Sequence, residues 1–154
     1  MALASLIIVM NKGRIEDMGP PARVYARPAT RFTAGFMGES TQIEGVVQAT
    51  GSEAVTVRTA LGEFVLPSPE AWRPGAAVAL LLRPENIRAD GSGDVALGEA
   101  RIVEVIFQGA HQRVLAKHAS GQDFLLRLAP DAEASAGLLL QLRCRRADLV
   151  LLEA

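Results

Sequence analysis

Hydrophobic and polar positions alternate in short runs along most of the chain from residue 43 onward. Gly, Pro, Asp and Ser separate these runs at intervals of about 8 to 12 residues, a pattern typical of small β-barrels and sandwiches. None of the runs has the length and period of a long helix. The expected strands are residues 43–49, 54–59, 62–66, 76–82, 100–107, 113–118, 123–128, 138–144 and 149–152.

The second half of this β region repeats the pattern of the first half. The first unit runs from Gly45 to Arg83 and the second from Ala100 to Arg143, and each ends on a strand closed by arginine. One unit is too short to close a core by itself. We therefore predict a mainly β fold, an OB-like small barrel or sandwich in which two half-barrel units pack face to face.

The N-terminal residues carry a different pattern, which predicts a short hairpin. Apolar residues fill positions 6–10, turn residues occupy 11–13, and a second β-rich run covers 14–18. Because every position of the first run is apolar, its strand is expected to be covered on both faces. A single hairpin cannot provide that cover.

Two short helices are expected between the hairpin and the β region. Pro20 and Pro21 can open a helix that Pro28 stops, because proline in the first turn forfeits no hydrogen bond. Residues 29–37 predict a second helix, which ends at Gly38. The predicted linker to the β region consists of Glu39, Ser40 and Thr41.

Charge and composition restrict the classes of partner. Sixteen Lys and Arg against seventeen Asp and Glu give a formal net charge of -1, so no overall field attracts nucleic acid or an anionic membrane. The longest apolar run, residues 76–82, is far shorter than the roughly 18 residues of a membrane-spanning helix. The single cysteine, Cys144, fits a reducing compartment. We expect a cytoplasmic protein with no nucleic-acid partner and no direct membrane insertion.

Residue types that catalysis or metal binding requires are scarce in this sequence. A phosphate-binding loop ends in Gly-Lys-Ser/Thr, and neither Lys12 nor Lys117 follows a glycine. His111 and His118 would point to opposite faces of one strand, and with one cysteine they cannot complete a four-ligand site. We therefore predict no catalytic residue, no cofactor and no metal, and so no enzyme activity of this chain.

The segment 81–88 is the remaining candidate for a functional role. Pro84 ends the preceding strand, after which the chain can turn and Ile87 can return to the core. One interpretation is a simple turn whose Arg83 and Glu85 pair at the surface. The alternative is an interface or regulatory loop. That loop would use Arg83, Pro84, Glu85, Asn86 and Arg88.

Five segments, in this order and spacing, resemble a known family. They are residues 8–15 (IVMNKGRI), Pro21 through 25–28 (YARP), 31–32 (RF), 36–40 (FMGES) and 82–87 (LRPENI). Together they are similar to the C-terminal half of ABC importer ATPases of the spermidine/putrescine, ferric-ion and sugar types, with the polyamine type nearest. The resemblance implies that residues 1–41 end a nucleotide-binding domain and that residues 42–154 form a transport-associated OB (TOBE) domain.

The resemblance also implies the role of a longer parent protein. The parent would use ATP and Mg to energise import of a small solute of the polyamine class, together with membrane subunits and a solute-binding protein. It would lie at the cytoplasmic face of the plasma membrane. This chain would contribute regulation and homodimerisation through its β region, and every catalytic motif would lie upstream of Met1. The turn at residues 144–148 departs from the acidic turn that is common in the family.

Two other functions fit the residues. The first is a free-standing OB-type sensor that holds a small anion or metabolite between its half-barrels. The second is a single-stranded nucleic-acid binder, since OB folds often serve this purpose. Saturable binding of a small ligand would distinguish the sensor, and salt-dependent binding to single strands would distinguish the nucleic-acid binder.

Overall fold

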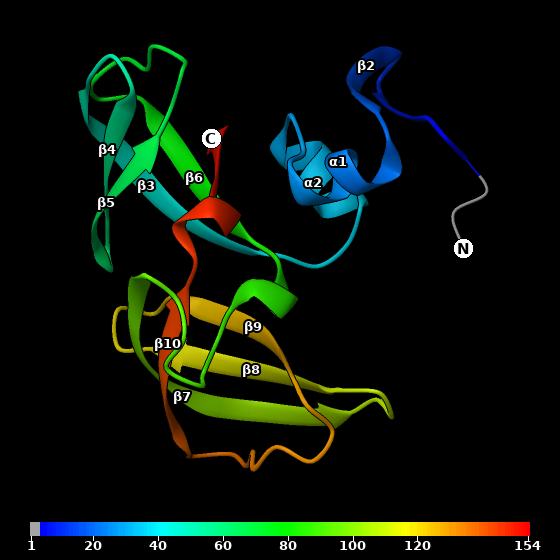
Figure 1. The fold of residues 1–154 in the computed structure, drawn as a ribbon, viewed down its shortest axis with the longest axis vertical. Helices are drawn as coiled ribbons and strands as arrows, with labels where there is room; N and C mark the ends of the chain where they lie inside the picture. The colour runs from blue at the N-terminus through cyan, green and yellow to red at the C-terminus, as the bar shows by residue number, and fades with distance from the viewer. Residues whose placement is uncertain (1–3) are drawn as a thin grey trace.

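The predicted mainly β fold is confirmed. The computed structural model describes residues 4–154, and strands account for most of its regular structure, with two α-helices and two 3-10 turns. Figure 1 shows two sheets, one above the other, with the N-terminal elements beside the upper sheet. No helix among residues 4–154 is long and apolar enough to cross a membrane.

The N-terminal hairpin forms where the apolar pattern places it. Strand β1 (Ile7–Asn11) pairs with β2 (Arg14–Gly19) across a turn in which Lys12 and Gly13 adopt φ of 48° and 77°. Within residues 4–154, one face of β1 is left uncovered, as expected for a hairpin without a further partner sheet. Val9 is 2% exposed, but the next residue, Met10, is 58% exposed.

Two six-residue helices follow the hairpin. Helix α1 (Pro21–Ala26) starts on its proline, and α2 (Arg31–Phe36) is capped by Thr30, whose Oγ1 accepts a hydrogen bond from the backbone N of Thr33 at 3.1 Å. The second helix is therefore shorter than the predicted 29–37, because the cap excludes the residues before it. We call residues 21–38 the helical segment.

The first sheet contains five antiparallel strands in the order β11-β6-β3-β4-β5. Its last strand in sequence, β11, pairs with β6, so the end of the chain returns to the first unit. The strands are β3 (Thr41–Thr50), β4 (Ala54–Thr59), β5 (Gly62–Pro67), β6 (Ala77–Leu82) and β11 (Val150–Glu153).

The second sheet has the order β10-β7-β8-β9 and is also antiparallel. Its long strand β7 begins before the predicted residue 100, because Gly98 at φ 98° accommodates an irregularity that the alternation pattern does not reveal. The strands are β7 (Val95–Phe107), β8 (Gln112–His118), β9 (Asp123–Leu128) and β10 (Leu139–Cys144).

The internal repeat is visible in equivalent backbone contacts. Val47 N donates to Ala76 O at 3.0 Å, and Ile102 N donates to Leu138 O at 2.8 Å, each where the strand is irregular. The two units also end in matching 3-10 turns, η1 (Pro84–Asn86) and η2 (Arg146–Asp148). Their N-caps are Arg83 and Arg145, so the arginine equivalent to Arg83 is Arg145 and not Arg143.

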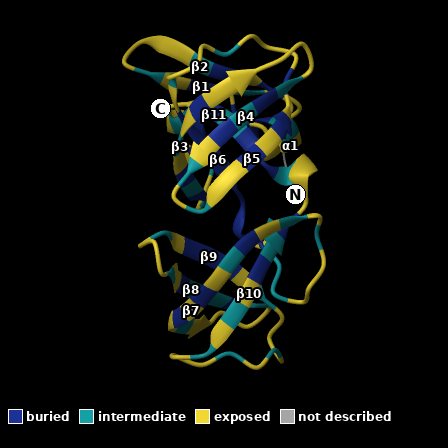
Figure 2. Cartoon of the chain, turned by 90° about the vertical axis from the view of Figure 1, so that its left-hand side faces the viewer, coloured by how far each residue is buried: buried dark blue, intermediate teal, exposed yellow. Residues whose placement is uncertain are grey.

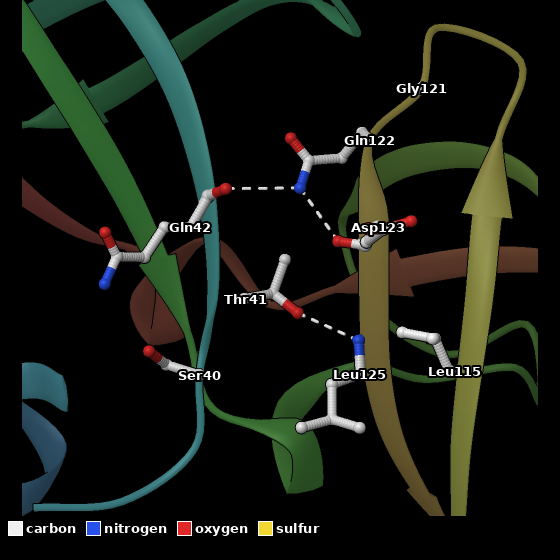
Figure 3. Close-up of a pocket in the computed structure, with 8 residues that line it drawn as sticks. All are labelled: Ser40, Thr41, Gln42, Leu115, Gly121, Gln122, Asp123 and Leu125. Carbon is white, nitrogen blue, oxygen red and sulfur yellow. Dashed lines mark hydrogen bonds between the residues drawn. The ribbon is translucent and has the colours of Figure 1, made fainter.

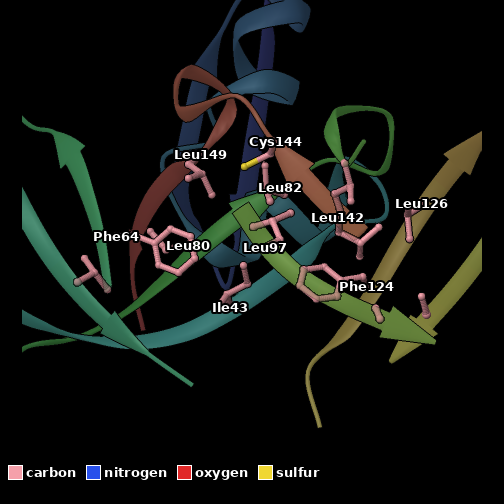
Figure 4. Close-up of a cluster of buried hydrophobic side chains, with 14 of the residues drawn as sticks. Ile43, Phe64, Leu80, Leu82, Leu97, Phe124, Leu126, Leu142, Cys144 and Leu149 are labelled. Carbon is pink, nitrogen blue, oxygen red and sulfur yellow. The ribbon is translucent and has the colours of Figure 1, made fainter. Parts of the chain in front are cut away.

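One hydrophobic cluster joins the two sheets, as the face-to-face packing requires. Leu80 from β6, Leu97 from β7, Phe124 from β9 and Leu142 from β10 are each at most 1% exposed (Figure 4). Figure 2 shows the buried positions alternating with exposed ones along the strands of both sheets. This shared core packs the two sheets against each other.

Candidate functional site, an arginine clamp on the linker

Arg83 lies at the end of β6 and is buried, with 2% of its surface exposed. Its Nη2 donates to Tyr25 O at 2.8 Å, and its Nη1 donates to the carbonyl oxygens of Ala34, Gly38 and Glu39 at 3.0, 3.1 and 3.1 Å. Carbonyls in the last turn of a helix have no partner within the helix. A fixed guanidinium fork can satisfy several of them at once. Arg83 therefore fastens the helical segment to the β region.

Tyr25 of α1 closes over the same guanidinium. The Cζ of Arg83 lies 4.2 Å from the centroid of the Tyr25 ring, a cation–π geometry. The Tyr25 hydroxyl donates to Glu85 Oε1 at 2.6 Å. Burial and then this hydrogen bond raise the pKa of Tyr25, so the hydroxyl keeps its proton. Burial lowers the pKa of Arg83 while Tyr25 and Glu85 oppose the shift.

The second unit holds the linker from the other side. Arg113 of β8 donates to Glu39 Oε1 from Nη2 at 2.7 Å and from Nε at 3.1 Å. The hydrogen bond from Arg113 lowers the pKa of Glu39. The linker carboxylate is therefore charged at neutral pH, and the pair reaches from residue 39 to a strand 74 residues away in the sequence.

Backbone groups complete the attachment of the linker to β9. The backbone N of Leu125 donates to Thr41 Oγ1 at 3.0 Å, and Gln122 Nε2 donates to Gln42 O at 3.2 Å (Figure 3). These residues line an open cavity of about 430 Å³ between the start of β3 and the β8–β9 hairpin. We call the contacts of the linker and helical segment the linker clamp, made by Tyr25, Glu39, Thr41, Arg83, Glu85, Arg113, Gln122 and Leu125.

The structure rejects a surface pair between Arg83 and Glu85. Arg83 is buried under Tyr25, whereas Glu85 turns to the tyrosine hydroxyl and lies 3.9 Å from Arg127 of β9. Asn86 only closes the turn, with its N donating to Arg83 O at 2.9 Å. Arg88 pairs its backbone with that of Arg143 in β10, beyond the clamp.

The remaining candidate residues stay outside the clamp. Arg145, in the turn after β10, is exposed and pairs locally, with its Nε 2.9 Å from Asp148 Oδ2. Cys144 is buried, and burial raises its pKa to about 12, so it acts as a core residue. Within the described range 4–154, no three His, Cys, Asp or Glu side chains are grouped so that they could hold a metal ion.

Sequence reasoning singled out Arg83 and the linker but missed Arg113 and Tyr25 as their partners. Tyr25 lies in one of the segments that carry the family resemblance. That resemblance was the one signal pointing to it. Arg113 is an ordinary charged residue on an alternating strand, and nothing in the pattern distinguishes it from other exposed arginines.

Residues 80–152 match the TOBE domain family. The chain is 33% identical over 139 residues to the spermidine/putrescine import ATP-binding protein PotA of Rubrobacter xylanophilus, covering 88% of this chain and 37% of that protein. It is 36% identical over 157 residues to the sn-glycerol-3-phosphate import ATP-binding protein UgpC of Chromobacterium violaceum, covering 100% of this chain and 41% of that protein. The chain thus spans about two fifths of the length of these relatives.

Two further comparisons concern another solute and the fold. The sulfate/thiosulfate import ATP-binding protein CysA 1 of Chromobacterium violaceum is 31% identical over 154 residues, covering 96% of this chain and 41% of that protein. Among solved structures, the cytoplasmic molybdate-binding protein ModG superposes with a TM-score of 0.61 at 12% identity, covering 73% of this chain and 95% of that chain. The second match supports the OB-type fold.

These matches confirm the resemblance seen in the sequence. Residues 80–152 match the TOBE domain, and the chain is similar, over most of its length, to ATP-binding subunits of ABC importers, with polyamine importers prominent among the relatives. They support its identification as the C-terminal part of such a subunit.

Proposed function

We propose that this chain is the regulatory and dimerisation part of an ABC importer ATP-binding subunit, the class of protein to which it is similar along most of its length. We further propose that the linker clamp couples the helical segment to the β region. The observation that supports this proposal most directly is the burial of Arg83, whose guanidinium donates hydrogen bonds to four carbonyl oxygens of the segment before β3. A buried guanidinium resists separation from its acceptors because each would be left unpaired. The two regions then move as one body.

The proposal divides the chain at the linker. Residues 1–41 would be the end of the nucleotide-binding domain, and residues 42–154 the TOBE domain. Exposed apolar side chains on the hairpin support the first part, because contiguous apolar surface of this kind marks an interaction site. Ile8, Met10, Ile15 and Met18 are between 49% and 60% exposed.

For the solute we propose the polyamine class. Several relatives are named spermidine/putrescine import proteins, while others are named for glycerol 3-phosphate and sulfate. The parent would bind ATP and Mg in the part that precedes this chain, and would work with membrane subunits and a solute-binding protein at the cytoplasmic face of the membrane.

Uptake by the assembled importer tests the coupling role. We would compare the full-length subunit with its Arg83→Met variant, in vesicles carrying the membrane subunits, for uptake of spermidine, sulfate and glycerol 3-phosphate. Coupling energies of about 1–3 kcal/mol correspond to roughly 5- to 150-fold effects, so spermidine uptake should fall at least fivefold. ATP hydrolysis by the isolated subunit should change less than about twofold, since the clamp contains no catalytic group.

A matched substitution separates coupling from general damage. Arg73 is exposed in the loop before β6, and Arg73→Met should leave uptake at the wild-type rate. Equal uptake by the Arg83→Met and Arg73→Met importers would remove the coupling role. Transport of sulfate or glycerol 3-phosphate in place of spermidine would overturn the solute class and leave the coupling role intact.

A further inference from the structure

The two sheets differ at the outer edges of their equivalent strands, β6 and β10. In the first sheet, β11 covers the outer edge of β6, starting with the pair of Val150 and Leu81. In the second sheet, β10 is an edge strand, and no strand among residues 4–154 covers it. A single isolated bridge, between Arg88 and Arg143, lies on that edge.

This isolated bridge is the repeat equivalent of the first pair between β11 and β6. Arg88 and Val150 each lie five residues after the arginine that caps their 3-10 turn. Arg143 and Leu81 each lie two residues before the same arginine. The second unit therefore begins the pairing that the first unit completes.

The two units diverge directly after this pair. In the first unit the chain continues as β11, and at its end Ala154 N donates to Ala77 O at 3.2 Å. In the second unit Asp90 turns the chain away from β10, since its Oδ1 accepts a hydrogen bond from Ser92 N at 2.9 Å. The second sheet thus lacks, within residues 4–154, a strand that the first sheet has.

Leu139 and Gln141 are the residues that this missing strand would pair with. The backbone of Arg143 points to the outer edge, because its N donates to Arg88 O at 2.9 Å and its O accepts from Arg88 N at 2.8 Å. Every second residue of an antiparallel strand directs its backbone groups to the same edge. Both residues are exposed. Their N–H and C=O groups are therefore available to a partner.

A cavity of about 420 Å³ opens beside this edge of β10. Its apolar walls include Ile87, Leu128 and Leu140. The equivalent cavity beside β11 is smaller, about 250 Å³, and has Trp72 and Leu151 in its lining. Residues directly opposite each other on paired strands point to the same face of the sheet. A partner residue opposite Leu140 would therefore direct its side chain toward the larger cavity.

Charge does not select the partner at this edge. The charged residues that line the cavity have both signs, so they create no strong field of one sign. They are Glu85, Arg88, Asp90, Arg127 and Glu133. A neutral aliphatic side chain suits the apolar walls better than a charged one, because burying an unpaired charge is costly.

We propose that the outer edge of β10 binds an extended segment of a partner protein, which adds to β10 as β11 adds to β6. The segment would lie antiparallel and opposite residues 139–141. Its central residue is aliphatic and enters the cavity beside Leu140, and its neighbours are polar and point to the solvent face. In this mode of recognition main-chain hydrogen bonds give affinity, and pockets for side chains give specificity.

A single segment fits this edge better than a second copy of the chain. If two β10 strands paired with each other, the Arg88 that each copy holds on its own edge would block the pairing beyond Gln141. A segment of three or four residues can end before it reaches Arg88. The proposal goes beyond the proposed function and does not rest on it, because it depends only on the second sheet.

Nuclear magnetic resonance of the 154-residue chain tests the site with a synthetic peptide, acetyl-Thr-Thr-Leu-Thr-Thr-amide. Binding should saturate with a Kd at or below about 1 mM. At saturation the amides of Leu139 and Gln141 should exchange at least about tenfold more slowly, because both gain an acceptor. The amide of Leu140 faces β7 and should change less than about twofold.

N-methylated peptides provide a matched control. A methyl group on the N of either threonine beside the leucine removes a hydrogen bond to β10 and should weaken binding at least about tenfold. A methyl group on the leucine N faces away from β10 and should weaken binding less than about threefold. Equal affinities of the methylated peptides would contradict strand addition.

Two substitutions at one position locate the peptide on the chain. Gln141→Pro removes the N–H from the edge and should weaken binding at least about tenfold. Proline is tolerated on an edge strand where the N–H faces solvent, and circular dichroism checks the fold. Gln141→Thr keeps the N–H and should bind like the wild type. Equal binding by the two variants would place the peptide elsewhere.

Two outcomes would overturn the proposal outright. The first is the absence of saturable binding of the unmethylated peptide. The second is protection of Leu139 and Gln141 that rises with protein concentration when no peptide is present, which would assign the edge to a second copy. Neither result affects the linker clamp, which the uptake assay with Arg83→Met tests separately.

Discussion

Arg83 illustrates how a single side chain can join two segments that lie far apart in sequence. Its guanidinium satisfies carbonyls of both short helices, and helices of six residues are too short to be stable without such tertiary contacts. The interaction depends on the planar geometry of the guanidinium as much as on its charge. An ammonium group at the end of a lysine side chain cannot reproduce the fork.

Arg83→Met should lower the free energy of unfolding by about 3 kcal/mol, because several buried carbonyls lose their donor while the apolar volume is retained. Urea denaturation followed by circular dichroism measures the change. Arg73→Met, at an exposed position, should stay within about 0.5 kcal/mol of wild type. Similar losses of unfolding free energy in the two variants would show that the clamp contributes nothing to stability.

The buried carboxylate of the hairpin should make stability depend on acid pH. Burial alone would raise the pKa of Asp17, but hydrogen bonds from Arg23 and from the backbone N of Ala29 and Met18 outweigh it and lower the pKa. A group with a lowered folded-state pKa stabilises above its unfolded value of about 4, and that contribution is lost as pH falls through the folded value.

Thermal unfolding between pH 7 and pH 2 measures this effect. The melting temperature should be flat from pH 7 to about pH 5 and should fall below about pH 4. Glu39, whose pKa Arg113 lowers, should add to the same acid decline. Asp17→Asn should flatten part of the decline, and an unchanged slope would argue against the hydrogen-bonded carboxylate.

At the scale of the elements, alternation and turn residues located most strands but not their pairing. The strands at 54–59 and 123–128 agree with β4 and β9. The return of β11 to β6 was not predictable, because register across sheets depends on non-local packing that a strand's own period does not encode. For the same reason, the sequence repeat aligns Arg83 with Arg143, two residues before Arg145, which is its equivalent in the structure.

In the candidate site, too, the sequence indicated some residues and could not indicate their partners. Local chemistry identified Arg83, since proline after a strand marks a constrained turn. Its acceptors are backbone carbonyls of residues 25–39, and every residue has such a group, so no side-chain pattern reveals them. The pair of Glu39 and Arg113 is equally hidden, because it joins a linker to a strand of the other unit.

The loop that enters β7 offers a test of how closely it packs against β10 in the second sheet. A Cβ on Gly93, whose φ is 108°, would lie 2.6 Å from the backbone O of Cys144 in β10. Gly93→Ala should therefore cost about 3 kcal/mol through backbone strain and displacement of β10. Gly91 has a similar φ of 84° but open space around it, so Gly91→Ala should cost only about 1 kcal/mol.

Denaturation of both alanine variants measures the difference. An equal loss at the two glycines would mean that β10 does not pack against residue 93 as the structure places it.

For the whole molecule, the proposed dimer needs an exposed surface on the β region. Val103, Ile106 and Phe107 of β7 are 51%, 41% and 67% exposed, so this strand presents accessible apolar side chains to a partner. Sedimentation equilibrium should show a dimer at micromolar concentration, and Phe107→Ser should shift it to monomer. A wild-type chain that stays monomeric at high concentration would count against dimerisation through this region.

The central claim is that Arg83 joins the helical segment to the β region as one body, and hydrogen exchange tests it most directly. In the wild type, amides of α1 and α2 should exchange as slowly as those of β3 and β6, because they open only with the fold. In Arg83→Met, the amides of β3 and β6 should lose only the protection that corresponds to the lowered global stability, while the helical amides should exchange at least about tenfold faster than those of β3 and β6. Unchanged protection of the helices in that variant would contradict the account.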